Sequence, residues 1–124
     1  MNILDRQEQI ANAFKGIHEN ILTEFKQHEK EENIIDDHWE KHGLGTGHSV
    51  IIDDGEFFGK AGINFSNIKG EKLPASSVGS INKSSGLPYF ATGVSVVFHP
   101  KNPNIPTSHL NIRYFCTYKN NEVF

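Results

Sequence analysis

The sequence predicts an α+β fold, an antiparallel sheet flanked by helices, in which an N-terminal amphipathic helix is followed by strands joined as hairpins. Two patterns support this prediction: one helical apolar stripe near the N-terminus, and later stretches in which polar and apolar residues alternate. Helical and strand patterns follow one another instead of interleaving, which is typical of α+β domains and not of βαβ units. The 124 residues suit a single domain.

We expect the helix over residues 5–30. Its apolar residues recur at helical spacing and form one stripe that includes Ile10, Phe14, Ile17, Ile21 and Phe25. Asp5 followed by Glu8 has the spacing of a capping box at the helix start. Because the polar face mixes acids and bases, we expect the stripe to pack on a sheet and not on a membrane surface.

The remainder of the chain predicts a loop and then strands. Alternating glycines, Gly43, Gly45 and Gly47, predict a glycine-rich loop over residues 39–48. Strands of the sheet are expected within residues 49–118, at 49–52, 56–65, 89–99 and 109–118. The pair Asp54-Gly55 predicts a type I′ turn between the first two strands. Residues 66–88, rich in Gly, Ser, Asn and Pro, indicate a long excursion.

Composition limits the classes of function. With 12 basic and 15 acidic residues and a net charge of −3, the chain does not resemble a general nucleic-acid binder. Cys116 is the single cysteine, which we expect to be packed, and no signal peptide is evident, so we expect a reducing, cytoplasmic environment. No apolar run approaches the ~18 residues of a membrane span.

The last two strands carry the sharpest chemical pattern. His109, Asn111 and Arg113 share one face of the last strand, and the opposite face carries Leu110, Ile112 and Tyr114. Ser95 and His99 share one face of the preceding strand. If His99 lies opposite His109, Ser95 lies opposite Arg113, and all five polar side chains form one surface.

This polar surface has two interpretations. It is either the ordinary solvent face of an antiparallel sheet or a binding surface. The second interpretation gains from the small neighbours Ala91 and Gly93, which leave open space, and from the lack of Lys and Glu in the set. Arginine offers a planar fork for a carboxylate, and histidine can transfer protons near neutral pH.

Other residues give weaker signals. His38 and His42 are four apart, but Gly43 follows and no third ligand has a defined spacing, so we do not expect a metal site there. His18 and His28 are expected to be exposed on the helix. The alternating glycines precede a strand and not a helix, which argues against a phosphate-binding loop.

Three blocks of the sequence resemble the oxygen-dependent coproporphyrinogen III oxidase family: GEFFGKAGINFS at 55–66, FATGVSVVFHP at 90–100 and NPNIPTSHLNIRYF at 102–115. Trp39 and the glycines before Ser49 also fit, and the third block is the most specific. Gly59 departs from the family, which usually has an acidic residue there.

The resemblance implies a haem-biosynthesis enzyme that converts two propionates of coproporphyrinogen III to vinyl groups, giving protoporphyrinogen IX, with molecular oxygen as co-substrate. It implies His109 as the catalytic proton donor, and Ser95, Asn111 and Arg113 as substrate-binding residues. It also implies His99 and His109 as ligands of a divalent metal such as manganese, although several members need no metal or organic cofactor.

The family is usually homodimeric and continues beyond the position of Phe124 with a glycine-rich segment and further histidines. We therefore expect this chain to be the N-terminal part of the enzyme domain, inactive alone and completed by a second copy or by a complementary C-terminal half. The alternative is a non-catalytic tetrapyrrole-binding or interaction module derived from the same sheet.

Overall fold

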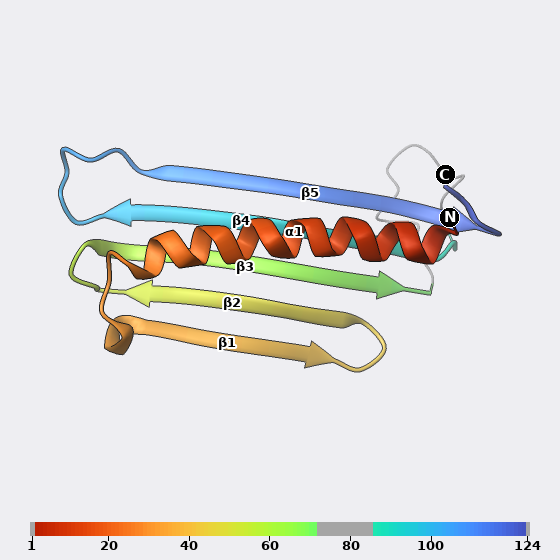
Figure 1. Cartoon of the computed structure of the whole chain (residues 1–124), viewed down its shortest axis with the longest axis horizontal. Coiled ribbons are helices and arrows are strands. Elements are labelled where there is room, and N and C mark those ends of the chain that lie inside the picture. The colour runs from red at the N-terminus through yellow and green to blue at the C-terminus, as the bar shows by residue number, and fades with distance from the viewer. Residues whose placement is uncertain (1, 72–85, 124) are drawn as a thin grey trace.

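The computed structural model describes residues 2–71 and 86–123, and within them one α-helix covers one face of an antiparallel sheet (Figure 1). The strands lie side by side in chain order and each pairs antiparallel with the next. The elements are α1 (Ile3–Lys26), the short 3-10 helix η1 (Glu31–Asn33), β1 (Ile34–Lys41), β2 (Gly45–Asp53), β3 (Phe58–Gly70), β4 (Tyr89–Pro100), β5 (Ser108–Lys119) and β6 (Glu122–Val123). The α+β prediction is confirmed.

Helix α1 begins earlier, at Ile3, and ends earlier, at Lys26, than the predicted range 5–30. Asn2 is its N-cap, because its side chain accepts a hydrogen bond from the backbone N–H of Asp5 at 2.8 Å. The predicted capping role of Asp5 is therefore wrong. The helix ends at Lys26, and Gln27 is its C-cap.

The buried side of α1 differs from the predicted stripe by one position near its middle. Ile17 is 38% exposed, whereas His18 is buried at 1% exposure. The His18 ring lies inside because its Nε2 donates a hydrogen bond to the carbonyl oxygen of Ile63 at 3.2 Å. The prediction that His18 is exposed is wrong, while His28 is exposed as predicted.

The predicted glycine-rich loop over residues 39–48 is also wrong, because most of it belongs to β1 and β2. Trp39 pairs directly with Gly47 across these strands, and a Cβ at Gly47 would overlap the Trp39 ring. Gly47 therefore serves close packing within a sheet. The turn between the strands is short and contains Gly43, whose φ of +77° favours glycine.

The connection between β2 and β3 is not the predicted type I′ turn, since φ is positive at Asp54 but not at Gly55. The connection extends to Phe57, and a register shift between Phe58 and Lys60 follows. This bulge turns Phe58 to the helix side with 7% exposure and leaves Phe57 at 39%. Simple alternation with the buried residues Ala61 and Ile63 would instead place Phe57, and not Phe58, on the helix side.

The core lies between α1 and the central strands. Leu22 and Phe25 of α1 pack against helix-side residues of β2, β3 and β4, including Val50, Ile52, Ile63, Phe65, Val94 and Val96. Cys116 is buried with Ala11 and Phe90 in a second cluster, as predicted. Figure 1 shows α1 lying along β3 and β4, so that both outer parts of this face extend beyond it.

The predicted excursion at 66–88 is partly strand, because β3 continues to Gly70. The segment 72–85 of that prediction lies outside the described residues. No helix among the described residues is long and apolar enough to cross a membrane.

Candidate substrate-binding face

The five polar residues predicted to share a surface do lie on one side of the sheet. In the pairing of β4 with β5, Val97 is opposite His109, Ser95 is opposite Asn111 and Gly93 is opposite Arg113. The expected pairing of Ser95 with Arg113 is therefore wrong by two residues. Side chains alternate with a period of two, so this offset changes the neighbours but not the face.

The sheet surface directed away from α1 is called the open face here. It carries the predicted site residues Ser95, His99, His109, Asn111 and Arg113, since Val96 and Phe98, which alternate with Ser95 and His99 on β4, pack on the core. Asn64 of β3 lies opposite Ser95, and Ser49 of β2 lies opposite Asn64. A row of four polar side chains thus crosses β2, β3, β4 and β5, ending at Asn111.

Arg113 lies beside the least bulky part of the open face. It pairs with Gly93, which in turn pairs with Ser66 of β3. A Cβ at Gly93 would lie 2.6 Å from the carbonyl oxygen of Ile112, so the two backbones approach closely. Gly93 is thus buried against the β5 backbone, while the side chain of Arg113 remains exposed on the open face.

The predicted polar side chains of this face have no polar partner within the described part of the chain, whereas Phe115 on the same face stacks on Tyr89. Arg113 is exposed and forms no ion pair there. The side chains of His99, His109 and Asn111 form no hydrogen bond in the described residues. A guanidinium, an amide and imidazoles are therefore available to an acidic ligand. Asn64 and Ser49 belong to this set and were missed as site residues, although alternation already places Asn64 on a polar face.

A manganese site at His99 and His109 is not complete in residues 2–71 and 86–123. The two imidazoles lie on the open face, but no third histidine, cysteine or carboxylate joins them within this part of the chain. Manganese favours carboxylate and water ligands over imidazole alone. The residues present do not fit the metal, and we assign it no step.

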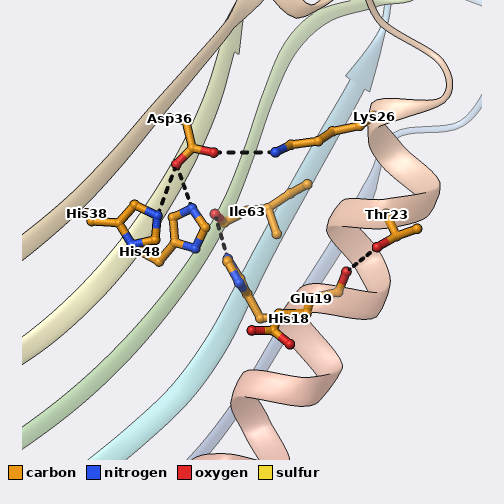
Figure 2. A network of polar contacts seen from close by, with 8 residues as sticks. All are labelled: His18, Glu19, Thr23, Lys26, Asp36, His38, His48 and Ile63. Carbon is orange, nitrogen blue, oxygen red and sulfur yellow. Dashed lines mark hydrogen bonds and ion pairs between the residues drawn. The ribbon is translucent and has the colours of Figure 1, made fainter.

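A second polar cluster occupies the opposite, helix-covered side of the sheet, near its β1 edge (Figure 2). Asp36 Oδ1 accepts a hydrogen bond from His48 Nε2 at 2.6 Å and lies 3.6 Å from His38 Nε2, while its Oδ2 lies 3.4 Å from Lys26 Nζ. Partial burial opposes the charge of Asp36, but the hydrogen bonds from His48 and Lys26 prevail and lower its pKa.

This second cluster extends to α1 through His18, whose ring meets the His48 ring edge-on with centroids 4.9 Å apart. Burial lowers the pKa of His18 despite the hydrogen bond to Ile63. His38 lies directly opposite His48 in the β1–β2 pairing, whereas His42 lies in the turn. The missed signal is the spacing Asp36-x-His38, which places both residues on one face of a strand.

Fold and site together define a class: an α+β sheet domain whose open face presents basic and amide side chains suited to carboxylates. The sequence profile of the family described as coproporphyrinogen III oxidase matches residues 9–124, and the chain belongs to this family.

Curated relatives agree with this assignment. The chain is 38% identical over 111 residues to the oxygen-dependent coproporphyrinogen-III oxidase of Synechococcus sp. (strain CC9605), covering 90% of the chain and 31% of that protein. It is 40% identical over 100 residues to the same enzyme of Prochlorococcus marinus (strain MIT 9313), covering 81% and 29%. The chain thus spans less than a third of the length of these relatives, which is consistent with the expected N-terminal part.

Proposed function

We propose that this chain carries the propionate-binding part of an oxygen-dependent coproporphyrinogen III oxidase of haem biosynthesis. In the proposed reaction each of two propionates loses carbon dioxide and two electrons and becomes a vinyl group. The four electrons reduce one molecule of oxygen to two molecules of water, with a net uptake of two protons. We place the reaction in the cytoplasm, since a single buried cysteine suits a reducing compartment.

The observation that carries the proposal is the exposed Arg113 guanidinium on the open face, which has no ion-pair partner among residues 2–71 and 86–123. In this proposal a carboxylate-bearing macrocycle lies over the open face while one propionate meets the exposed guanidinium. Asn111 and Ser95, which face each other in the next row, would hydrogen-bond the substrate. We assign His109, one row further, the proton transfer.

The isolated chain should bind substrate without turning it over. It spans about 31% of a curated relative, and correct positioning of reacting groups can supply about 7–11 kcal/mol of barrier reduction. We propose that a second copy or a complementary C-terminal half completes the site. A non-catalytic tetrapyrrole-binding module is the second candidate, because the open face alone already offers the binding groups.

The test separates binding from turnover. Coproporphyrinogen III is added to the pure chain without oxygen, oxygen is then admitted, and protoporphyrin is measured by fluorescence after oxidation of the products. We expect binding but no turnover, and we expect turnover when the remaining two thirds of a cyanobacterial relative is added. Binding without turnover in both samples would favour the non-catalytic candidate. A failure to bind in either sample would contradict both.

A further inference from the structure

Strands β1 and β2 bring three metal-ligand side chains to one point on the helix side of the sheet, opposite the open face. Asp36 and His38 are two residues apart on β1 and share a face. His48 lies directly across from His38 on β2. The paired backbones of the strands fix the positions of all three Cβ atoms, and a site on regular strands is more rigid than one on loops.

The ligand atoms lie close enough together for small side-chain shifts to place them around one divalent ion. One ligand atom from each residue lies within 4.8 Å of the other two. The distances from Asp36 Oδ1 are 2.6 Å to His48 Nε2 and 3.6 Å to His38 Nε2. Ligands at ~2.0–2.2 Å around a tetrahedral zinc ion are about 3.3 Å apart, and the two observed distances lie on either side of this value.

Two imidazole nitrogens compete for the same carboxylate oxygen. The rings of His38 and His48 are stacked with centroids 3.7 Å apart, and both Nε2 atoms point toward Asp36 Oδ1 (Figure 2). A hydrogen bond satisfies only the nearer nitrogen, and His38 is left with a contact too long for a hydrogen bond. A metal ion that replaces the proton of the His48–Asp36 hydrogen bond, with that proton released to solvent, would engage all three atoms.

The surroundings hold the ligands and leave room for water. Lys26 Nζ forms an ion pair with Oδ2 of Asp36, and the other oxygen, Oδ1, faces the histidines. The buried ring of His18 packs against His48. A surface hollow of about 340 Å³ adjoins His38 and His48 and is also lined by Glu19. Water in this hollow can occupy the remaining coordination positions.

We propose that Asp36, His38 and His48 form a binding site for a divalent transition-metal ion of the zinc class. Two imidazoles and one carboxylate suit Zn²⁺, Co²⁺ and Ni²⁺ and disfavour Mg²⁺ and Ca²⁺, which prefer all-oxygen shells. Three protein ligands with open positions give an exchangeable site. The proposal is independent of the substrate chemistry assigned to the open face.

The test is titration of the metal-free 124-residue chain with Co²⁺, followed by visible absorption, and with Zn²⁺ in competition. We expect one equivalent of Co²⁺ to give the absorption of a low-coordinate ion and Zn²⁺ to displace it. His38→Gln should weaken binding at least tenfold with the fold intact, because this side chain is 74% exposed. His48→Gln and Asp36→Asn should have the same effect on binding.

Matched controls decide where the ion binds. His42→Gln changes an exposed histidine in the adjacent turn and should leave the Co²⁺ affinity unchanged. The double variant His99→Gln, His109→Gln on the open face should also bind as the parent does. The proposal is overturned if Co²⁺ does not bind, if His38→Gln binds as tightly as the parent, or if only the double variant loses binding.

Discussion

The carboxylate of Glu29 accepts a hydrogen bond from the backbone N–H of Phe58, 29 positions along the chain, at 2.9 Å. The same carboxylate accepts from the N–H groups of Phe57 at 2.6 Å and Glu56 at 3.0 Å. One buried side chain following α1 thus satisfies the backbone of the β2–β3 connection. These hydrogen bonds, together with the turn at Asp54-Gly55, hold the segment that leads into β3.

Replacing Glu29 by Gln should destabilise the protein. The amide loses the negative charge and points an N–H donor at backbone donors, and hydrogen bonds to charged groups contribute roughly 1.5–3 kcal/mol. We expect a loss of about 2 kcal/mol in the free energy of unfolding, measured with urea. Glu8→Gln, an exposed change on α1, is the control and should have little effect. Equal stability of both variants would show that the connection forms without Glu29.

The contribution of Glu29 should also depend on pH. Burial opposes its charge, but the hydrogen bonds from Phe58, Glu56 and Phe57 prevail and hold its pKa below the usual 4.5. A lowered folded-state pKa contributes stability above the unfolded pKa, and this stability is lost as pH falls through the folded value. The stability difference between the parent and Glu29→Gln should be constant near neutrality and shrink below about pH 4.5. A difference that is the same at pH 7 and pH 3 would contradict the assignment.

Arg113 should contribute to tetrapyrrole binding through a propionate. Loss of one charge-assisted interaction of roughly 1.5–3 kcal/mol corresponds to about tenfold to hundredfold weaker binding. We expect this effect for Arg113→Ala with coproporphyrinogen III in anaerobic calorimetry, with an unchanged unfolding transition. Arg6→Ala is the matched control, because Arg6 lies on α1 on the other side of the sheet. Equal affinities of the two variants would refute the role of Arg113.

Gly93 should be required for the close pairing of β4 and β5. A Cβ there would lie 2.6 Å from the Ile112 carbonyl oxygen, which belongs to the backbone and cannot move away alone. We expect Gly93→Ala to cost about 1–3 kcal/mol in thermal or urea unfolding. Gly62→Ala on the same face is the control, since its new Cβ meets only Asn64 Nδ2 at 3.7 Å. A Gly93→Ala variant as stable as the control would show that the strands adjust freely.

The alternation of residues along β4 and β5 was sufficient to predict which side chains share the open face, because an error of two residues in the strand register leaves every side chain on the same face. Ser95 and Arg113 are correctly placed on one surface although their pairing is offset by two residues. Long-range contacts could not be predicted in the same way. His18 is buried through a carbonyl on β3, and Asp36 meets His48 only once β1 and β2 pair. Local sequence carries no signal for such partners. The alternating glycines resemble a loop, although Gly47 fits against the Trp39 ring within the sheet.

The chain should associate at its β5 edge. Strand β6 pairs only with Tyr118 and Lys119, so in the described residues most of the outer edge of β5 has no backbone partner. Helix α1 contacts the C-terminal part of this strand, where Ala11 packs with Cys116. Leu110 and Phe115, on opposite faces of the strand, remain 41% and 50% exposed. An exposed apolar edge strand pairs readily with another chain, and a second copy or the complementary half would cover both side chains.

Light scattering over a concentration series measures this association, and we expect the mean mass and the midpoint of thermal unfolding to rise with concentration. The double variant Leu110→Lys, Phe115→Lys places charges on the edge strand and should shift the protein toward monomer by at least tenfold in dissociation constant. Leu4→Lys changes a leucine that is 53% exposed on α1 and should associate as the parent does. A monodisperse parent monomer with a concentration-independent transition would mean that the β5 edge is protected within the chain itself.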